Sequence, residues 1–161
     1  MRKLKIKNGV NQMKMLVCTD GSENSQKTLE RAAMIAGGCQ VSDVAVIHVY
    51  DNMQDISTLP KDFTSSEQIE RFRKMMESHK KERYKILEDA VKYLESKGIK
   101  ARPIFKEGHP SHTIVQTCAE GNFDMIVIGS RGTGGLKKVF LGSVSNAVTQ
   151  EAKNCTVMTV K

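Results

Sequence analysis

The chain has 161 residues, of which 39% are hydrophobic and only three are proline, so it suits one compact domain and is too apolar for general disorder. No apolar stretch approaches the ~20 residues that span a bilayer, and the basic start lacks the apolar core of a signal peptide, so we expect a cytoplasmic protein without a membrane partner. The net charge is +7, but five basic residues precede the first acidic residue. We therefore interpret Met1 to Gln12 as a mobile basic extension and residues 13–161 as the domain, and nucleic acid is not the expected partner.

Five short apolar runs are predicted strands. They are Met15–Cys18, Val44–Val49, Ala101–Phe105, Met125–Ile128 and Thr156–Val160. The second and fourth are almost continuously apolar, as strands covered on both faces are. Helical patterns lie between the runs, and this alternation predicts a parallel sheet with helices on its faces.

Four helices are predicted between these strands. They begin at Ser22 or Ser25, at about Ser66, at Pro110 and after Ser143. The second is long and ends at about Lys97, before Gly98. The stretch Asp51–Ser65 in front of it is the one long irregular connection.

The long second helix carries apolar residues at helical spacing. This stripe runs through Ile69, Phe72, Met76, His79, Ile86, Ala90 and Leu94. We expect it to pack on the core. A partner-binding groove that includes Met75 is the less favoured alternative.

The four cysteines form no CxxC pair and no zinc-binding spacing with the four histidines. They are Cys18, Cys39, Cys118 and Cys155. We interpret them as reduced thiols rather than as redox or metal-binding groups, because isolated buried cysteines behave as small hydrophobic residues.

The order of the strands follows from one proline and from chain handedness. Pro103 cannot donate a ladder hydrogen bond, so the third strand is predicted at an edge. Right-handed crossovers then favour the order 3-2-1-4-5, a Rossmann-like open α/β sheet with helices on both faces. Such sheets bind ligands where the order reverses, here beyond strands 1 and 4. The loops that begin at Thr19 and at Gly129 are expected to meet there.

The segment after the fourth strand contains two glycine signals separated by nine residues. The first is Gly129 with Gly132, and the second is Gly142 with Ser143. Glycine lets backbone amides approach an anion, and Ser143 stands at a predicted helix start, where amides can face a phosphate. Positive charge is added by Arg131, Lys137 and Lys138. A flexible crossover with solvated lysines is the alternative, but glycine signals at two turns favour a phosphate site. The segment matches neither GxxxxGK[ST] nor GxGxxG.

The pattern G-x2-G-x9-G-[ST] in this segment resembles the motif of the nucleotide-binding universal stress proteins. The resemblance extends to MLVCTDGS in the first strand and loop, VAVIHVYD in the second strand, FDMIVIGSRG in the fourth and the closing CTVMTVK. It covers about Met13 to Lys161. It departs from the common pattern where Thr156, instead of proline, follows Cys155.

This resemblance implies that the protein binds ATP. Asp20 matches the aspartate that recognises the adenosine portion, although capping of the following helix through an Asx-type turn is an equal alternative. Thr19 is its neighbour, and Val49 matches the position beside the adenine. Contacts with ribose and phosphates are implied for Gly129, Arg131, Gly132, Gly142, Ser143, Val144 and Ser145. Mg²⁺ can accompany ATP, held by the phosphates and Ser143.

The resemblance further implies a nucleotide-dependent regulatory or stress-response protein that forms a homodimer through Thr156 to Val160 and acts on unknown protein partners. The sequence offers no convincing base, since Glu107 and His109 follow the third strand, away from the point of reversal. We therefore expect hydrolysis that is slow or partner-stimulated at most. The alternative is a nucleotide-consuming enzyme, an ATPase or an adenylate-transferring catalyst, on the same fold. A nucleotide-free interaction module is a third and weaker hypothesis.

Overall fold

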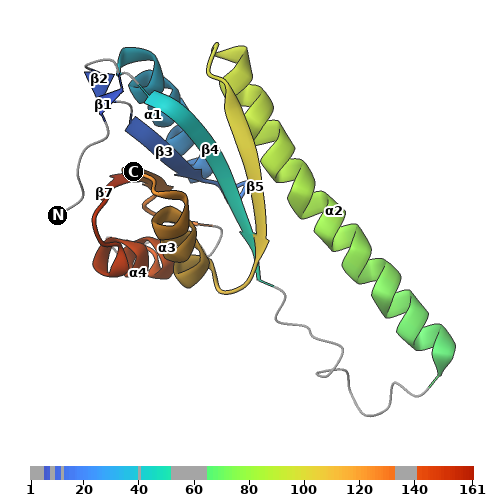
Figure 1. Cartoon of the computed structure of the whole chain (residues 1–161). Coiled ribbons are helices and arrows are strands. Elements are labelled where there is room, and N and C mark those ends of the chain that lie inside the picture. The colour runs from blue at the N-terminus through green and yellow to red at the C-terminus, as the bar shows by residue number, and fades with distance from the viewer. Residues whose placement is uncertain (1–5, 8–9, 12, 40, 52–64, 133–140) are drawn as a thin grey trace.

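The computed structural model describes residues 6–7, 10–11, 13–39, 41–51, 65–132 and 141–161 of the chain. Its main sheet has five parallel strands: β3 (Met13–Cys18), β4 (Val41–Tyr50), β5 (Ala101–Glu107), β6 (Met125–Gly129) and β7 (Thr156–Val160). Their spatial order is β5-β4-β3-β6-β7, which confirms the predicted order 3-2-1-4-5 (Figure 1). Pro103 lies in the edge strand β5, as its missing N–H group requires.

The helices cover both faces of this sheet (Figure 1). On one face lie α1 (Glu23–Gly38) and α2 (Ser66–Ser96), and on the other lie α3 (Pro110–Gly121) and α4 (Ser143–Glu151). Each face has its own apolar core. In β3, Met15 and Val17 belong to the first core and Leu16 and Cys18 to the second. This two-sided burial is the reason why the central strands have apolar residues at successive positions.

The helix ends agree with local side-chain chemistry. Ser22 caps α1 by accepting a hydrogen bond from the Ser25 N–H group, and Ser65 forms a capping box with Gln68 at the start of α2. Gly98 follows α2 with a φ of +77°, a conformation that favours glycine.

Two short strands precede β3. β1 (Ile6–Lys7) and β2 (Val10–Asn11) pair in an antiparallel hairpin. The sequence analysis did not predict them, because strands of two residues are too short to show an alternation pattern. The rest of the predicted N-terminal extension and residues 52–64 of the predicted irregular connection lie outside the described residues.

The predicted core stripe of α2 is wrong for the first half of the helix. Only Leu87, Ala90, Val91 and Leu94 are buried, whereas Ile69, Phe72 and Met76 are partly buried and His79 is exposed. A helix of 31 residues is about 46 Å long, and the strands it covers are about 23–33 Å long, so the helix is longer than its support. The N-terminal half of α2 therefore extends past the sheet (Figure 1).

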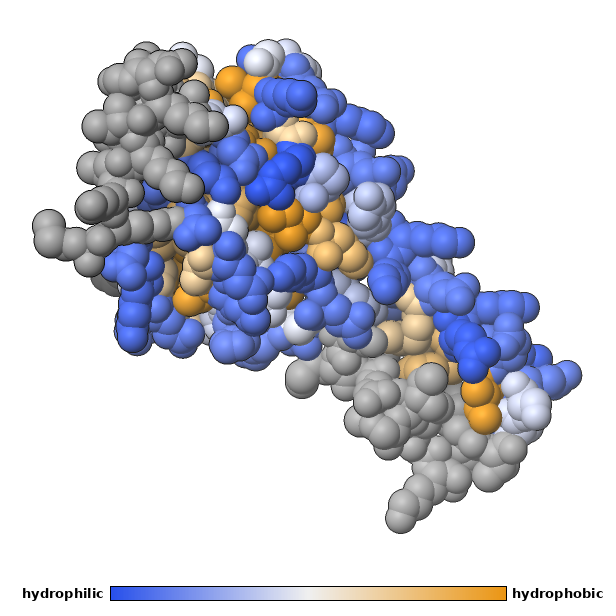
Figure 2. All heavy atoms as spheres, in the orientation of Figure 1, coloured by the Kyte–Doolittle hydropathy of each residue, from blue (hydrophilic) through white to orange (hydrophobic). Residues whose placement is uncertain are grey.

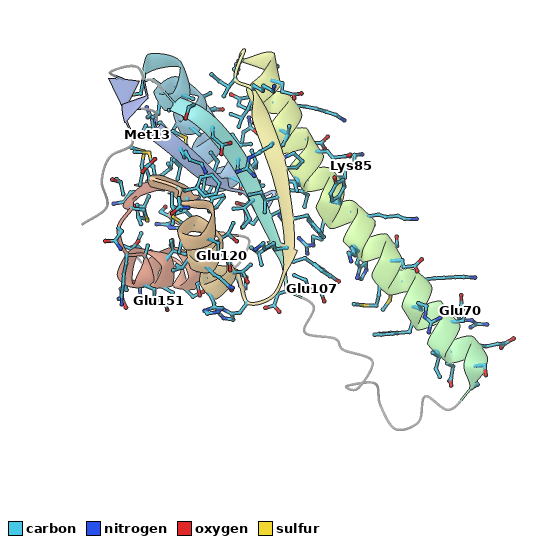
Figure 3. All side chains as sticks on the ribbon, viewed as in Figure 1. Met13, Glu70, Lys85, Glu107, Glu120 and Glu151 are labelled. Atoms are coloured by element: carbon cyan, nitrogen blue, oxygen red, sulfur yellow. The ribbon has the colours of Figure 1, made fainter. Side chains whose placement is uncertain are left out.

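The projecting part of α2 is largely polar on its visible face. Figure 2 shows hydrophilic side chains over much of this region, and Figure 3 places Glu70 near its free end and Lys85 where the helix lies against the sheet. None of the helices within the described ranges has the length and apolar content to cross a membrane.

A charged cluster closes the amino end of the sheet. The Arg102 guanidinium on β5 donates two hydrogen bonds of 3.0 Å to the Asp43 carboxylate on β4, and the Lys14 ammonium of β3 lies 3.5 Å from the same group. Both cations also lie over the Phe123 ring, at 5.5 and 5.0 Å from its centroid. The hydrogen bonds from Arg102 hold the pKa of Asp43 below its usual range. The Asp43 carboxylate thus links the three adjacent strands β3, β4 and β5.

We expect Asp43→Asn to lower the free energy of unfolding by about 0.5–1 kcal/mol at pH 7, the range of well-oriented surface ion pairs. Since the pKa of Asp43 is lowered in the folded state, this stabilisation is complete above the unfolded pKa near 3.9 and is lost as the pH falls through the folded value. Urea unfolding at pH 7 and below pH 4 measures the difference. Glu88→Gln, at an exposed carboxylate of α2, is the control. If the wild type and Asp43→Asn still differed in free energy of unfolding below pH 4, the ion-pair explanation would be contradicted.

Candidate functional site

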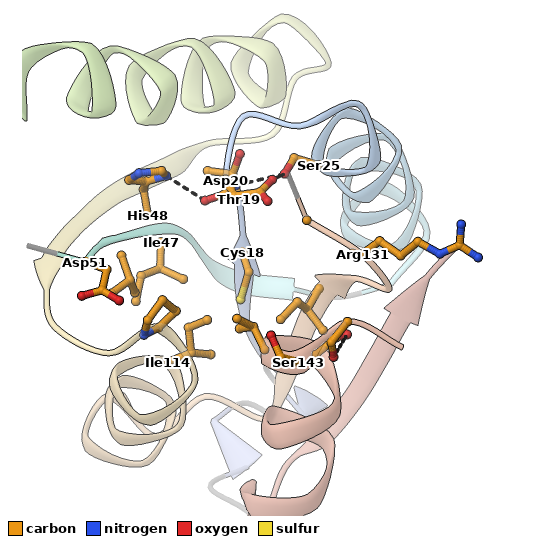
Figure 4. Close-up of a pocket in the computed structure, with 18 of the residues that line it drawn as sticks. Cys18, Thr19, Asp20, Ser25, Ile47, His48, Asp51, Ile114, Arg131 and Ser143 are labelled. Carbon is orange, nitrogen blue, oxygen red and sulfur yellow. Dashed lines mark hydrogen bonds between the residues drawn. The ribbon is translucent and has the colours of Figure 1, made fainter. Parts of the chain in front are cut away.

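A pocket of about 500 Å³ opens at the carboxyl ends of β3, β4 and β6. The ten residues that the sequence analysis proposed all line it: Thr19, Asp20, Val49, Gly129, Arg131, Gly132, Gly142, Ser143, Val144 and Ser145. Figure 4 shows Asp20 at the end of β3, with Arg131 and Ser143 on one side of the pocket and His48 and Asp51 on the other. Residues 133–140 between the two glycine signals, including Lys137 and Lys138, lie outside the described residues.

The loop after β3 holds the Asp20 carboxylate in a fixed orientation. Its Oδ1 atom accepts hydrogen bonds from the Ser22 N–H group (3.0 Å) and from the Ser25 hydroxyl. In return, the Asp20 N–H group donates to Ser25 Oγ at 2.9 Å. A Cβ atom on Gly132 would lie 2.5 Å from Asp20 Oδ2, so that second oxygen faces the glycine loop. The two sequence interpretations of Asp20 are therefore compatible, because one oxygen forms the turn and the other faces the pocket.

The end of β6 is joined to the start of α4 by two hydrogen bonds to the Ser130 carbonyl. The Gly142 N–H group donates to the Ser130 carbonyl at 2.7 Å, and Ser145 Oγ lies 3.0 Å from the carbonyl oxygens of Ser130 and Gly142. The Ser130 N–H group in turn donates to the Val160 carbonyl of β7 at 2.6 Å. Ser130 and Ser145 are buried. This network fixes the position of the α4 N-terminus over the pocket.

Gly142 is the N-cap residue of α4 and provides no side-chain cap. Its φ of −67° is accessible to any residue, and an added Cβ atom would meet its neighbours at 3.5 Å or more, which is ordinary contact. Neither backbone conformation nor packing therefore requires glycine here. Its absent side chain leaves the first amide groups of a nine-residue helix open to the pocket, an arrangement that favours a bound anion.

His48 lines the pocket and was missed by the sequence analysis. Its side chain is 3% exposed, its Nδ1 atom lies 2.8 Å from the Thr19 carbonyl and its ring stacks on Phe105. Because a carbonyl only accepts, Nδ1 carries the proton. Burial lowers the pKa of His48, and the charge of Arg83 lowers it further, against the opposing influence of the Thr19 hydrogen bond. The one signal in the sequence was a histidine within an otherwise apolar strand.

Arg83 and Cys18 also line the pocket, and the sequence analysis did not place either of them in the site. Arg83 reaches the pocket from α2, and Cys18 lies at the end of β3. Burial raises the pKa of the Cys18 thiol well above its ordinary value, so the group is protonated. The alternative catalytic pair, Glu107 and His109, is absent from the described residues that line the pocket. No group of three acidic, histidine or cysteine side chains within the described ranges forms a metal site.

The fold and the site together define a doubly wound α/β protein with an anion-favouring pocket at the point where the strand order reverses. A model of the universal stress protein family matches residues 12–161, and the chain belongs to this family. The universal stress protein YxiE of Bacillus subtilis is 36% identical over 155 residues, which are 92% of this chain and 98% of that protein. The sequence resemblance to universal stress proteins is thus confirmed.

Solved structures of the family have the same fold. Protein MJ0577 of Methanocaldococcus jannaschii is 28% identical with a TM-score of 0.69, over 94% of this chain and 97% of that one. A universal stress protein solved in complex with dAMP, from Archaeoglobus fulgidus, has a TM-score of 0.61 at 23% identity, over 92% and 98% of the two chains. Another, solved in complex with cAMP, has a TM-score of 0.65 at 20% identity, over 92% and 96%.

We expect His48→Phe to keep the ring contact with Phe105 but to lower the free energy of unfolding by about 1–2 kcal/mol at pH 7.5, because the Thr19 carbonyl loses its donor. Since the pKa of His48 is lowered on folding, the wild type itself loses stability as the pH falls through the unfolded pKa near 6.5. The difference in free energy of unfolding between the wild type and His48→Phe should therefore become smaller towards pH 5. Urea unfolding at pH 7.5, 6 and 5 measures it.

The matched control is His79→Gln, at an exposed position of α2, which should stay within about 0.5 kcal/mol of the wild type at each pH. A difference between His48→Phe and the wild type that widens on acidification would show that the histidine is not held neutral.

Proposed function

We propose that this protein binds ATP in the pocket at the ends of β3 and β6 and acts as a nucleotide-dependent regulatory protein of the stress response. The observation that carries the proposal is the start of α4, where Gly142 leaves backbone amides open to the pocket without a structural need for glycine. The cAMP and dAMP complexes of the two family members support a nucleotide as the ligand.

In this proposal the two walls of the pocket bind different parts of ATP. The phosphates are held by backbone amides of the Gly129–Gly132 turn and of the α4 N-terminus, with Ser143 as a hydroxyl ligand. The Asp20 carboxylate accepts hydrogen bonds from ribose hydroxyls or from the exocyclic amine, and Val49 lies beside the adenine. Arg131 adds a positive charge near the phosphates.

In this proposal Mg²⁺ binds together with ATP and is held mainly by the phosphates rather than by a set of protein ligands, as is usual in nucleotide sites. On the side proposed for phosphate the described lining residues supply the hydroxyls of Ser143 and Ser145, and Ser145 already donates to the Ser130 and Gly142 carbonyls. We propose that hydrolysis is slow or depends on a partner. The second candidate, a nucleotide-consuming enzyme on the same fold, requires a positioned base.

We also place the protein in the cytoplasm, because all four cysteines are free thiols, as is usual in a reducing compartment.

We further propose a homodimer that pairs β7 with its copy. β7 lies at the edge of the described sheet. The Thr156 N–H group donates to the Asp124 carbonyl and the Val160 carbonyl accepts from Ser130, so these backbone groups point toward β6. By alternation along the strand, the backbone groups of Val157 and Thr159 point to the open edge. Pairing of two such edges would satisfy these groups in both copies.

We expect the wild type to bind ATP with one site per chain and Gly142→Val to bind it at least about tenfold more weakly, equivalent to ~1.4 kcal/mol, because its side chain adds bulk at the start of α4, which lines the pocket. The free energy of unfolding should change by less than about 1 kcal/mol, since the φ at this position suits valine. Titration calorimetry and urea unfolding measure the two quantities. Gly37→Ala, where nothing lies within 4 Å of the added carbon, is the control.

Absence of ATP binding by the wild type, or equal affinity in Gly142→Val, would overturn the proposed site. Single-turnover release of ADP separates the two candidate functions on the same samples. Slow release fits the regulatory protein, whereas fast release without a partner would establish the enzyme instead.

We expect Thr159→Pro to convert the dimer to a folded monomer. Proline removes an N–H group that points to the open edge, and edge positions tolerate this loss within the sheet itself. Sedimentation velocity gives the mass and circular dichroism verifies the fold. A wild type that sediments as a monomer, or a variant that remains dimeric, would contradict the β7 interface.

A further inference from the structure

The face of α2 that packs on the sheet is apolar in the core but carries a basic side chain where the helix passes the pocket. Leu87 and Leu94 are buried in the core, and one turn before Leu87 the same face presents Arg83, which lines the pocket. Close to this point, Ile86 lies against Gly21 of the Asp20 loop, where a Cβ atom would come within 2.9 Å of Ile86 Cδ1. α2 therefore reaches the site through both a cation and an apolar contact.

Arg83 has no ion-pair partner among the described residues. His48 lines the same pocket close enough for the charge of Arg83 to lower its pKa, and it already donates to the Thr19 carbonyl. Asp51, an exposed carboxylate, lines the same end of the pocket. The Arg83 guanidinium therefore offers the pocket N–H donors that form no ion pair with a described carboxylate.

The two ends of the pocket differ in the groups that form them. The side of Arg131 and Ser143 is formed by the glycine segment and the start of α4, and on the side of His48 and Asp51 the polar groups are side chains (Figure 4). In Figure 4, α2, drawn in green, passes on the His48 side. If the phosphates occupy the side of the glycine segment, Arg83 faces the base.

We propose that Arg83 contacts the base of the bound nucleotide and selects purines over pyrimidines. This inference rests on the proposed function. A purine carries an acceptor nitrogen, N7, on the edge of its second ring, and an arginine fork is well suited to donate to that edge. Pyrimidines lack this atom. Asp51, at the same end, is an acceptor for the exocyclic amine of adenine.

The same contact links the ligand to the projecting half of α2. Arg83 stands at the boundary between the part of the helix that is packed on the sheet and the part from Ser66 onward that extends past it (Figure 1). A bound base that holds Arg83 restrains the helix at this boundary. Amide exchange in residues 66–82 should therefore slow when a purine nucleotide binds.

The test compares ATP with CTP as probes in four proteins: the wild type, Arg83→Ala, Arg83→Lys and Lys85→Ala. Lys85 is the matched control, because it is a basic residue of the same helix that is exposed and does not line the pocket. We expect Arg83→Ala to weaken ATP binding about tenfold, the loss of one hydrogen bond from a charged donor, and to leave CTP binding within about twofold. Arg83→Lys should restore part of the ATP affinity, and Lys85→Ala should match the wild type.

The outcomes separate the inference from the function on which it rests. If the wild type binds neither nucleotide, the proposed function fails and the inference fails with it. If the wild type binds ATP and Arg83→Ala does so equally well, only the role of Arg83 is overturned. Equal weakening of ATP and CTP would also overturn it, because the guanidinium would then bind phosphate. Hydrogen exchange gives a second readout: ATP should protect residues 66–82 in the wild type and in Lys85→Ala, and much less in Arg83→Ala.

Discussion

The parallel pairing of β3 with β6 is the contact on which the whole site depends. Met15–Val17 lies in register beside Met125–Val127, and the chain leaves these two strands in opposite directions, toward α1 on one face and toward α4 on the other. Because neither connection crosses above this pair, a crevice remains between the two loops. Asp20 and the glycine segment face each other across it. The position of the pocket is thus set by topology, and the loop residues decide only what it can bind.

The two walls of the pocket have different tolerance to sequence change. The wall formed by the glycine segment presents backbone amides, which remain when side chains are replaced, and it is restricted chiefly by the space that added atoms would occupy. The opposite wall presents the side chains of His48, Asp51 and Arg83, which single substitutions remove. In the proposed function, binding of the part common to all nucleotides and selection among nucleotides are therefore assigned to separate walls.

Much of the fold was predictable because its signals are local. Strand β7 was predicted with its observed bounds, the glycine motif led to the pocket, and Pro103 correctly indicated an edge strand. The core stripe of α2 was predicted incorrectly because periodicity reports that a helix has an apolar face and not what covers that face. His48 and Arg83 were missed for a related reason. They come from a strand and a helix far apart in sequence, and only the tertiary arrangement brings them to one wall.

The protonated thiol of Cys18 gives the pocket a particular chemical stability. Oxidants and alkylating agents react with the thiolate, and burial keeps this sulfur in the neutral form. Cys39, by contrast, is exposed. Oxidants in solution would therefore modify the exposed Cys39 before Cys18, which is buried in the wall of the pocket.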